Sequence, residues 1–195
     1  MDGENSLLFL DPALLVIDRL DCLSIAYMVV GSLAVSAHGV SRGTRDTDIV
    51  ADLRIGDGRR LAAILGKEFY MDAEVAEEAI RRRSSFSVIY MPKVFKVDLF
   101  PLSPRAYDRE ALRRRRWVSL EPDPPRAVFV ESPEDVVLSK LRWYRQGGEV
   151  SDQQWRDVLG VLKLQAGRLD MEYLRRWAAE EKVLDLLERA VRQAS

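Results

Sequence analysis

The sequence predicts an α+β (α/β) fold, in which a mixed β-sheet with flanking helices is followed by a C-terminal helical extension. Two observations lead to this prediction. Up to residue 120, short apolar runs of strand length alternate with amphipathic helical segments. In segment 121–125, three prolines in four residues exclude a continuous helix or a central strand, and almost every later segment has helical periodicity. We therefore expect an α/β domain over residues 1–125 and a helical subdomain over 126–195.

Local signals place the elements of the first part. Asp11 and Pro12 are typical of a helix start, which predicts a helix over 14–23. The apolar run 27–30 ends at Gly31 and predicts a buried strand. The other elements expected here are helices over 32–38, 58–69 and 73–82 and strands over 47–53, 84–90 and 94–100, the last two as a hairpin.

The helices of the second part have clear start signals. Ser132 is a good N-cap and Pro133 suits the first helical position, so a helix is expected from there to Arg145, before the glycine pair 147–148. Further helices are expected over 151–164, 170–179 and 182–193.

Composition excludes several classes of protein. Hydrophobic residues make up 47% and charged residues 31% of the 195 residues, with a net charge of −1, which is ordinary for a globular protein and excludes a disordered chain. The single cysteine, Cys22, excludes an internal disulfide and is expected to be a buried thiol in a reducing compartment. The acidic N-terminal stretch is unlike a signal peptide, and the longest uncharged run, 22–37, is too short to span a membrane. We expect a cytoplasmic protein.

Three carboxylates suggest a metal site. Side chains two apart in a strand share a face, so Asp46 and Asp48 should point the same way, roughly 6.5–7 Å apart. Asp98 is a third acid within an otherwise apolar strand, where a charge is costly unless it is paired or binds a metal. If the two strands are neighbours, the three carboxylates converge and repel one another, and Mg²⁺ is the usual answer to such a cluster. The alternative is that these acids are solvent-exposed groups at strand ends.

Gly31 and Ser32 supply a complementary feature. They lie between a predicted strand and a predicted helix, where free backbone N–H groups and a hydroxyl favour a phosphate. Ser32 is an equally good N-cap, and the two roles are compatible.

Together these residues resemble a known signature. Val-Gly-Ser at 30–32, a spacer of thirteen residues and Asp-Thr-Asp-Ile at 46–49 are similar to the motif of the nucleotidyltransferase superfamily, with Asp98 as its third acid. Thr47 departs slightly from the motif, in which an apolar residue is commoner. The resemblance covers residues 25–100 and implies a nucleotidyltransferase-like sheet.

The resemblance also implies an activity and a site. In the superfamily the three acids hold two divalent cations, so Asp46, Asp48 and Asp98 are expected as catalytic residues and as ligands of Mg²⁺ or Mn²⁺. Asp98 is expected to activate the attacking hydroxyl as well. The expected nucleotide-binding residues are Gly31, Ser32, Arg45 and Lys140.

The predicted helical tail resembles bacterial nucleotidyltransferase-like proteins of abortive-infection and toxin–antitoxin systems. Such tails carry Pro-Glu-Asp and a lysine on one helix, here 133–135 and Lys140, and Arg-Asp on the next, here Arg156 and Asp157. This match implies a triphosphate contact for Lys140 and a supporting role for Asp157.

Other charged residues allow two interpretations. Arg42 and Arg45 either hold phosphates or the neighbouring acids, or belong to an ordinary surface loop. The basic runs 81–83 and 113–116 are expected to be solvated helix faces rather than RNA-binding patches, because no aromatic residues are interleaved with them. The only histidine, His38, is expected at a helix end rather than as a catalytic base. The aromatic residues expected in the core of the helical part are Trp143, Tyr144, Trp155 and Trp177.

Three functions remain open at this point. The first is a metal-dependent nucleotidyltransferase that transfers a nucleoside monophosphate from an NTP to an acceptor hydroxyl of RNA, a protein or a small molecule. The second is a non-catalytic nucleotidyltransferase-like component of a toxin–antitoxin pair that acts by binding a partner such as a cognate antitoxin. The third is an RNA-binding module that uses the basic middle third of the chain, with binding that weakens steeply with salt.

Overall fold

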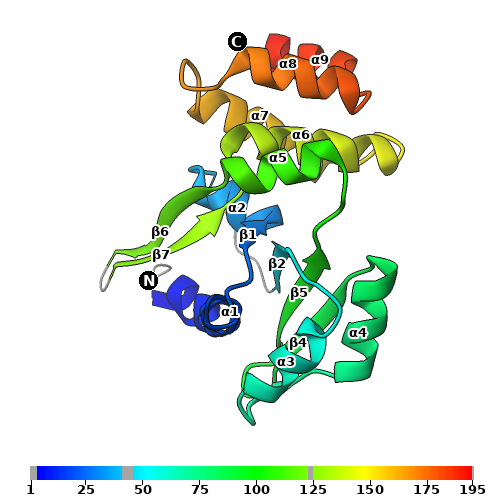
Figure 1. Ribbon diagram of the computed structural model, residues 1–195. Helices are drawn as coiled ribbons and strands as arrows, with labels where there is room; N and C mark the ends of the chain where they lie inside the picture. Colours follow the sequence, from blue (N-terminus) through cyan, green and yellow to red (C-terminus); the bar gives the residue numbers. More distant parts are fainter. Residues whose placement is uncertain (1–3, 41–45, 123–124, 195) are drawn as a thin grey trace.

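The computed structural model describes residues 4–40, 46–122 and 125–194, and within these ranges the strands form one seven-stranded sheet. The strands are β1 (Tyr27–Val30), β2 (Asp46–Ala51), β3 (Phe69–Tyr70), β4 (Phe86–Tyr90), β5 (Phe95–Pro101), β6 (Arg116–Pro122) and β7 (Pro125–Val130). Their order is β3-β4-β5-β2-β1-β7-β6 (Figure 1). The pairs β2–β5 and β1–β7 are parallel and the other pairs are antiparallel, so the predicted mixed sheet with a helical C-terminal part is confirmed.

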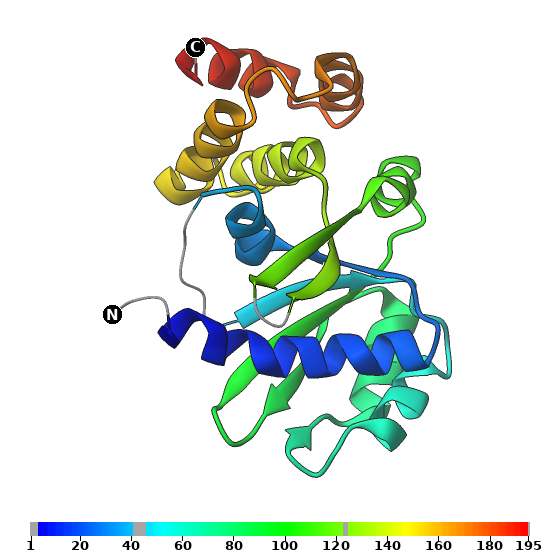
Figure 2. The same cartoon turned by 90° about the vertical axis from the view of Figure 1, so that its left-hand side faces the viewer.

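Helices cover the sheet unequally. They are α1 (Glu4–Cys22), α2 (Gly31–Ala37), α3 (Asp57–Ile64), α4 (Ala73–Arg82), α5 (Ala106–Arg114), α6 (Pro133–Gln146), α7 (Asp152–Leu164), α8 (Met171–Glu180) and α9 (Leu184–Ala194). The first of these, α1, runs across one face of the sheet (Figure 2). The short helix α2 contacts both β2 and α6, and the helices α5 to α9 gather at one end of the molecule (Figure 1).

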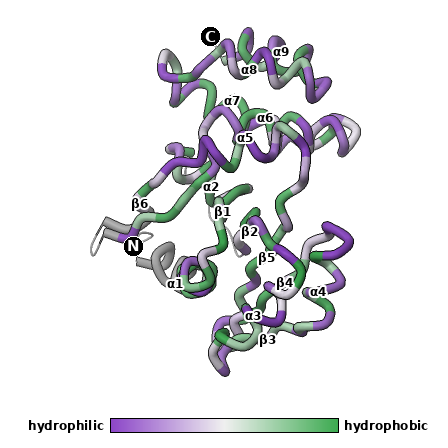
Figure 3. Tube along the Cα trace, viewed as in Figure 1, coloured by the Kyte–Doolittle hydropathy of each residue, from purple (hydrophilic) through white to green (hydrophobic). Residues whose placement is uncertain are grey.

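The core follows the alternation of the strands. In β2 the side chains of Thr47, Ile49 and Ala51 are buried on one face, which leaves the two aspartates of this strand on the other. Hydrophobic residues concentrate around β1 and α2, whereas α5 is largely hydrophilic (Figure 3). Among the described helices, none is both long enough and apolar enough to cross a membrane.

Two expectations for the first helix are wrong. The helix begins at Glu4, so Pro12 lies inside α1 instead of opening it, and its side chain is buried. Cys22 is exposed rather than buried. The buried positions of α1 recur at helical spacing up to Leu20, and residues 21 and 22 fall outside that stripe, which explains the exposed thiol.

Three further differences concern segments with weak local signals. The helix expected over 58–69 ends at Ile64, and Phe69 pairs with Tyr90 in the sheet instead. Helix α5 was not anticipated. The strands β6 and β7 pair in antiparallel fashion up to Pro122 and Pro125, so residues 125–130 are strand rather than part of the helical tail. Pro122 is tolerated because β6 is an edge strand, and Pro125 is tolerated because it is the first residue of β7. The division of the chain at residue 125 stays a prediction.

The predicted caps of the C-terminal helices are confirmed. The side chain of Ser132 accepts a hydrogen bond from the backbone N–H of Asp135, and Ser151 and Asp170 cap α7 and α8 in the same way.

A buried glutamate on α4 caps its neighbour α3. Glu77 accepts hydrogen bonds from the backbone N–H groups of Gly56 (2.9 Å) and Arg59 (3.1 Å). Burial alone would raise the pKa of the Glu77 carboxyl, but these hydrogen bonds hold it below its ordinary value. One side chain thus satisfies donors at the start of α3 and fixes the α3–α4 pair.

We predict that Glu77→Ala destabilises the protein by about 3 kcal/mol, because it leaves buried N–H donors without an acceptor. Urea unfolding measures the loss. Glu78→Ala is the control: Glu78 is half-buried and pairs with Arg81 and Arg82 at the surface, and its removal should cost less than about 1 kcal/mol. Equal losses in the two variants would contradict the capping role.

Candidate functional site

The pairing of β2 with β5 brings the three acids onto one face of the sheet. Asp48 and Asp98 are Cα partners in the parallel ladder, and paired residues share a face. Asp46, two residues before Asp48, lies on the same face and is exposed, and its Cα partner is Lys96. The strands that carry these acids are therefore neighbours, which is the condition that the sequence argument set for a cluster of carboxylates.

Asp98 has protein partners for both of its oxygens. Ser87 on β4 donates its hydroxyl to Oδ1 at 2.6 Å, and the Lys96 ammonium lies 2.6 Å from Oδ2. Lys96 was not among the expected site residues. Its place two residues before Asp98 in the same strand is a sequence signal that could have indicated it.

The environment of Asp48 disfavours the charge on its carboxyl. Burial raises its pKa, and the negative charges of Asp46 and Asp98 raise it further, while Lys96 and Lys140 act in the opposite direction. The ionised form of Asp48 is thus disfavoured in the protein alone, and a cation bound at this face would relieve the repulsion.

Gly31 lies against Asp48. Its φ is +67°, and a Cβ atom at this position would lie 2.4 Å from Asp48 Oδ2. Only glycine combines this backbone conformation with such a close approach. Ser32 lies in the first turn of α2, where Val30 occupies the N-cap position, so the alternative role of Ser32 as an N-cap is wrong.

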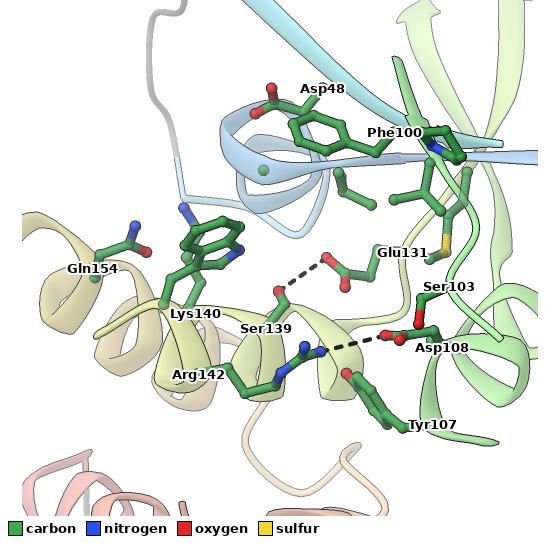
Figure 4. A pocket seen from close by; sticks show the side chains of 17 residues that line it. Asp48, Phe100, Ser103, Tyr107, Asp108, Glu131, Ser139, Lys140, Arg142 and Gln154 are labelled. Atoms are coloured by element: carbon green, nitrogen blue, oxygen red, sulfur yellow. Dashed lines mark hydrogen bonds and ion pairs between the residues drawn. The ribbon is translucent and has the colours of Figure 1, made fainter. Parts of the chain in front are cut away.

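A cavity of about 350 Å³ separates this face of the sheet from α6, and its volume is within the range of small-molecule sites (Figure 4). Asp48, Gly31 and Phe100 line it on the side of the sheet, and Lys140 lines it from α6. Asp46, Asp98 and Ser32 are not among its lining residues. Arg45, together with Arg42, lies outside the residues that the structure describes.

Lys140 is held by the following helix. Its ammonium lies 3.0 Å from Asp157 Oδ2, and both side chains are buried. Gln153 donates its amide to the other oxygen of Asp157 at 2.8 Å. The Lys140 ammonium on this wall of the cavity is therefore positioned by α7.

Glu131 is a site residue that sequence reasoning missed. It follows β7, its backbone N–H donates to Val29 O at 2.9 Å, and it lines the cavity with 3% of its surface exposed. Burial raises the pKa of its carboxyl to about 8, with the charge of Asp135 adding to the effect, while a hydrogen bond from Ser139 (3.3 Å) opposes it. An acid directly after the apolar run 127–130 was the available signal.

His38 lies at the C-terminal end of α2, as expected. Its Nε2 lies 2.7 Å from the backbone oxygen of Glu131, and burial lowers the pKa of the ring. This contact joins the end of α2 to β7.

Four charged groups close a ring at the far end of the cavity, where Figure 4 shows Arg142 and Asp108 joined. The Arg142 guanidinium lies 3.3 Å from Asp108 and 2.9 Å from Glu181. Arg105 contacts the same two carboxylates. Because Glu181 follows α8, this ring joins the cavity wall to the C-terminal helices.

The basic runs take part in ion pairs and ring contacts. Arg114 and Arg116 lie near the buried Glu134, and the guanidinium of Arg115 covers the ring of Phe129. In the other run, Arg81 and Arg82 pair with Glu78 on the same helix.

One of the expected core aromatic residues is elsewhere. Tyr144 and Trp177 are buried and Trp155 packs against the core, as expected. Trp143 is exposed and lines the cavity. Helical periodicity gave the face of α6 on which Trp143 lies but not that this face borders a cavity.

The acids fit a cation that is bound jointly with a substrate. In the described part of the chain, no three His, Cys, Asp or Glu side chains gather closely enough to hold an ion by themselves. Mg²⁺ usually takes one or two carboxylates together with water and substrate phosphates. Asp46 and Asp48 supply such hard oxygen donors on the face that borders the cavity.

Comparison with known proteins identifies the fold. No family model and no curated protein sequence matches the chain. An antigenic nucleotidyltransferase-like protein from Paracoccidioides brasiliensis superimposes with a TM-score of 0.54 and 15% identity over 91% of this chain and 89% of that one. The antibiotic-resistance factor ANT(2'')-Ia superimposes with a TM-score of 0.50 and 12% identity over 97% and 99%. The chain therefore has a nucleotidyltransferase-like fold.

We predict that Gly31→Ala destabilises the protein by about 2 kcal/mol and displaces the Asp48 carboxylate, because the left-handed backbone is strained with a side chain and the new Cβ meets Oδ2. Gly148→Ala is a matched control with φ +75° and no atom within 4 Å of the new Cβ. Urea unfolding and Mg²⁺ titration of both variants separate the effects. Retention of wild-type Mg²⁺ binding in Gly31→Ala would contradict the close approach.

We predict that Glu131→Gln gains stability over the wild type as pH rises. The pKa of Glu131 is raised to about 8 in the folded protein, so its favourable contribution is complete below its ordinary pKa near 4.5 and is lost towards pH 8. The variant should gain about 2 kcal/mol relative to the wild type between pH 5 and pH 7. Urea unfolding at several pH values measures this, with the exposed Glu180→Gln as a control that should follow the wild type. A gain that does not depend on pH would contradict the prediction.

Proposed function

We propose that the protein is a metal-dependent nucleotidyltransferase that transfers a nucleoside monophosphate from an NTP to an acceptor hydroxyl. The observation that carries the proposal is Asp48, which borders the cavity, is in contact range of Gly31 and shares its face of the sheet with Asp46 and Asp98. The nucleotidyltransferase-like fold supports it.

In this proposal each group has a role set by its position. Asp46 and Asp48 hold Mg²⁺ or Mn²⁺, and Asp98 contributes to the catalytic cation. Such a cation, when bound, neutralises phosphate charge and makes the transferred phosphorus more electrophilic. Gly31 and Ser32 present backbone N–H groups and a hydroxyl to the triphosphate, and the buried ammonium of Lys140 reaches it from α6.

The transfer itself is an in-line displacement. The acceptor oxygen forms a bond to the α-phosphorus while the bond from this phosphorus to the pyrophosphate oxygen breaks. Asp98 accepts the proton of the acceptor hydroxyl, with Ser87 and Lys96 fixing the orientation of its carboxylate. The acceptor belongs to one of three classes: an RNA end, a protein side chain or a small molecule.

We predict that the protein binds at least one of ATP, CTP, GTP and UTP in a Mg²⁺-dependent manner, and that the double variant Asp46→Asn/Asp48→Asn loses this binding by at least about 100-fold. The reason is that two carboxylates that hold the cation become neutral amides. Calorimetric titration with and without Mg²⁺ is the measurement. Asp52→Asn, just beyond the other end of β2, is the matched control and should bind as the wild type does.

The same variants separate the proposal from a toxin–antitoxin component that acts by binding. Such a component should keep its protein partner in the double variant and bind no nucleotide. The absence of Mg²⁺-dependent binding of all four nucleotides to the wild type would overturn the enzyme proposal.

A further inference from the structure

An exposed tryptophan lines the cavity beside Lys140. Trp143 is 58% exposed although it is the largest apolar side chain of α6. It follows Lys140 by three residues and Ser139 by four, so the three side chains share one face of the helix and all line the cavity. The backbone of Trp143 therefore lies about 4.5 Å along the helix axis from that of Lys140, whose ammonium is assigned to the phosphates.

The indole of Trp143 has a free face. Within the ranges that the structure describes, its ring has no aromatic or cationic partner. Trp117 is equally exposed, at 60%, but its ring packs edge-on against Phe129 at 4.6 Å and does not line the cavity. An unpartnered indole at the wall of a polar cavity is a stacking surface for a planar ligand.

A second, independent observation indicates a ligand at the same end. Gln154 on α7 lines the cavity, and its Oε1 is buried and makes no hydrogen bond with any described residue. Figure 4 shows Gln154 near Lys140, at the end away from Tyr107 and Asp108. A buried acceptor without a donor is costly, so a ligand that supplies a donor is stabilised there.

We infer that Trp143 and Gln154 form the nucleobase subsite of the cavity: the indole stacks on the face of the base, and the Gln154 amide hydrogen-bonds its edge. The inference rests on the proposed function and deepens it. A side-chain amide carries both an acceptor and donors, which match the amino group and ring nitrogen on the edge of adenine and, in the same sense, of cytosine. The phosphates then extend towards Lys140 and Gly31, and the end with Ser103, Tyr107 and Asp108 is left for the acceptor.

The test compares nucleotides with inorganic tripolyphosphate, which has no base. Trp143→Ala should weaken the binding of Mg²⁺-ATP or of the preferred Mg²⁺-nucleotide by about 10-fold, the effect expected for one lost stacking contact, and should leave Mg²⁺-tripolyphosphate unchanged. Gln154→Leu should weaken the binding of nucleotides and reduce the differences in affinity among ATP, CTP, GTP and UTP. Trp117→Ala is the matched control and should bind as the wild type does.

Tryptophan fluorescence provides a readout that does not depend on Trp143→Ala folding. Nucleotide binding should quench fluorescence in the wild type and in Trp117→Phe, and the quenching should be absent in Trp143→Phe, in which the phenyl ring maintains nucleotide affinity. Wild-type nucleotide affinity in Trp143→Ala, or an equal loss of tripolyphosphate binding, would overturn the inference and leave the proposed function standing. If the wild type binds neither tripolyphosphate nor any nucleotide, with or without Mg²⁺, the proposed function fails and the subsite fails with it.

Discussion

The parallel pairing of β2 with β5 puts like charges side by side, and the rest of the candidate site is arranged around this repulsion. Asp48 and Asp98 are register partners, and Asp46 lies on the same face. A sheet does not gain stability from neighbouring carboxylates. The molecule reduces the cost by exposing Asp46 and by placing the ammonium groups of Lys96 and Lys140 in range of the cluster.

The two cations differ in how they are held. Lys96 extends from the same strand as Asp98, is half exposed and pairs with the Asp98 carboxylate at the surface of the sheet. Lys140 is buried against Asp157, and breaking such a buried pair is costly. The positive charge opposite the sheet is therefore a buried part of the cavity wall, whereas the positive charge on the sheet itself is exposed to solvent.

The sequence predicted those features that depend on local rules. Alternation placed Asp46 and Asp48 on one face, and capping rules placed the starts of α6, α7 and α8. Gly31 was identified from its place between a strand and a helix, although its contact with Asp48 was not. These features need no knowledge of distant parts of the chain.

Features that depend on tertiary structure were not predicted. The prolines around residue 123 hid the antiparallel pairing of β6 with β7, because prolines argue locally against strands. The pairing of β7 with β1 joins residues that are far apart in the sequence, so no local pattern shows it. Glu131 follows β7, and its burial depends on the covering helix α6, so its role was not visible either. Periodicity assigned Trp143 to a helix face but contained no information on whether another element covers that face.

The ring formed by Arg105, Asp108, Arg142 and Glu181 has a consequence for the evolution of the sequence. Each member has two neighbours of opposite charge, and the last of them belongs to the turn after α8. The far wall of the cavity is thus partly encoded some forty residues beyond Arg142. Recombination that exchanged the C-terminal helices between related chains would transfer a share of the wall with them, so the two parts of the chain are expected to change together rather than as independent modules.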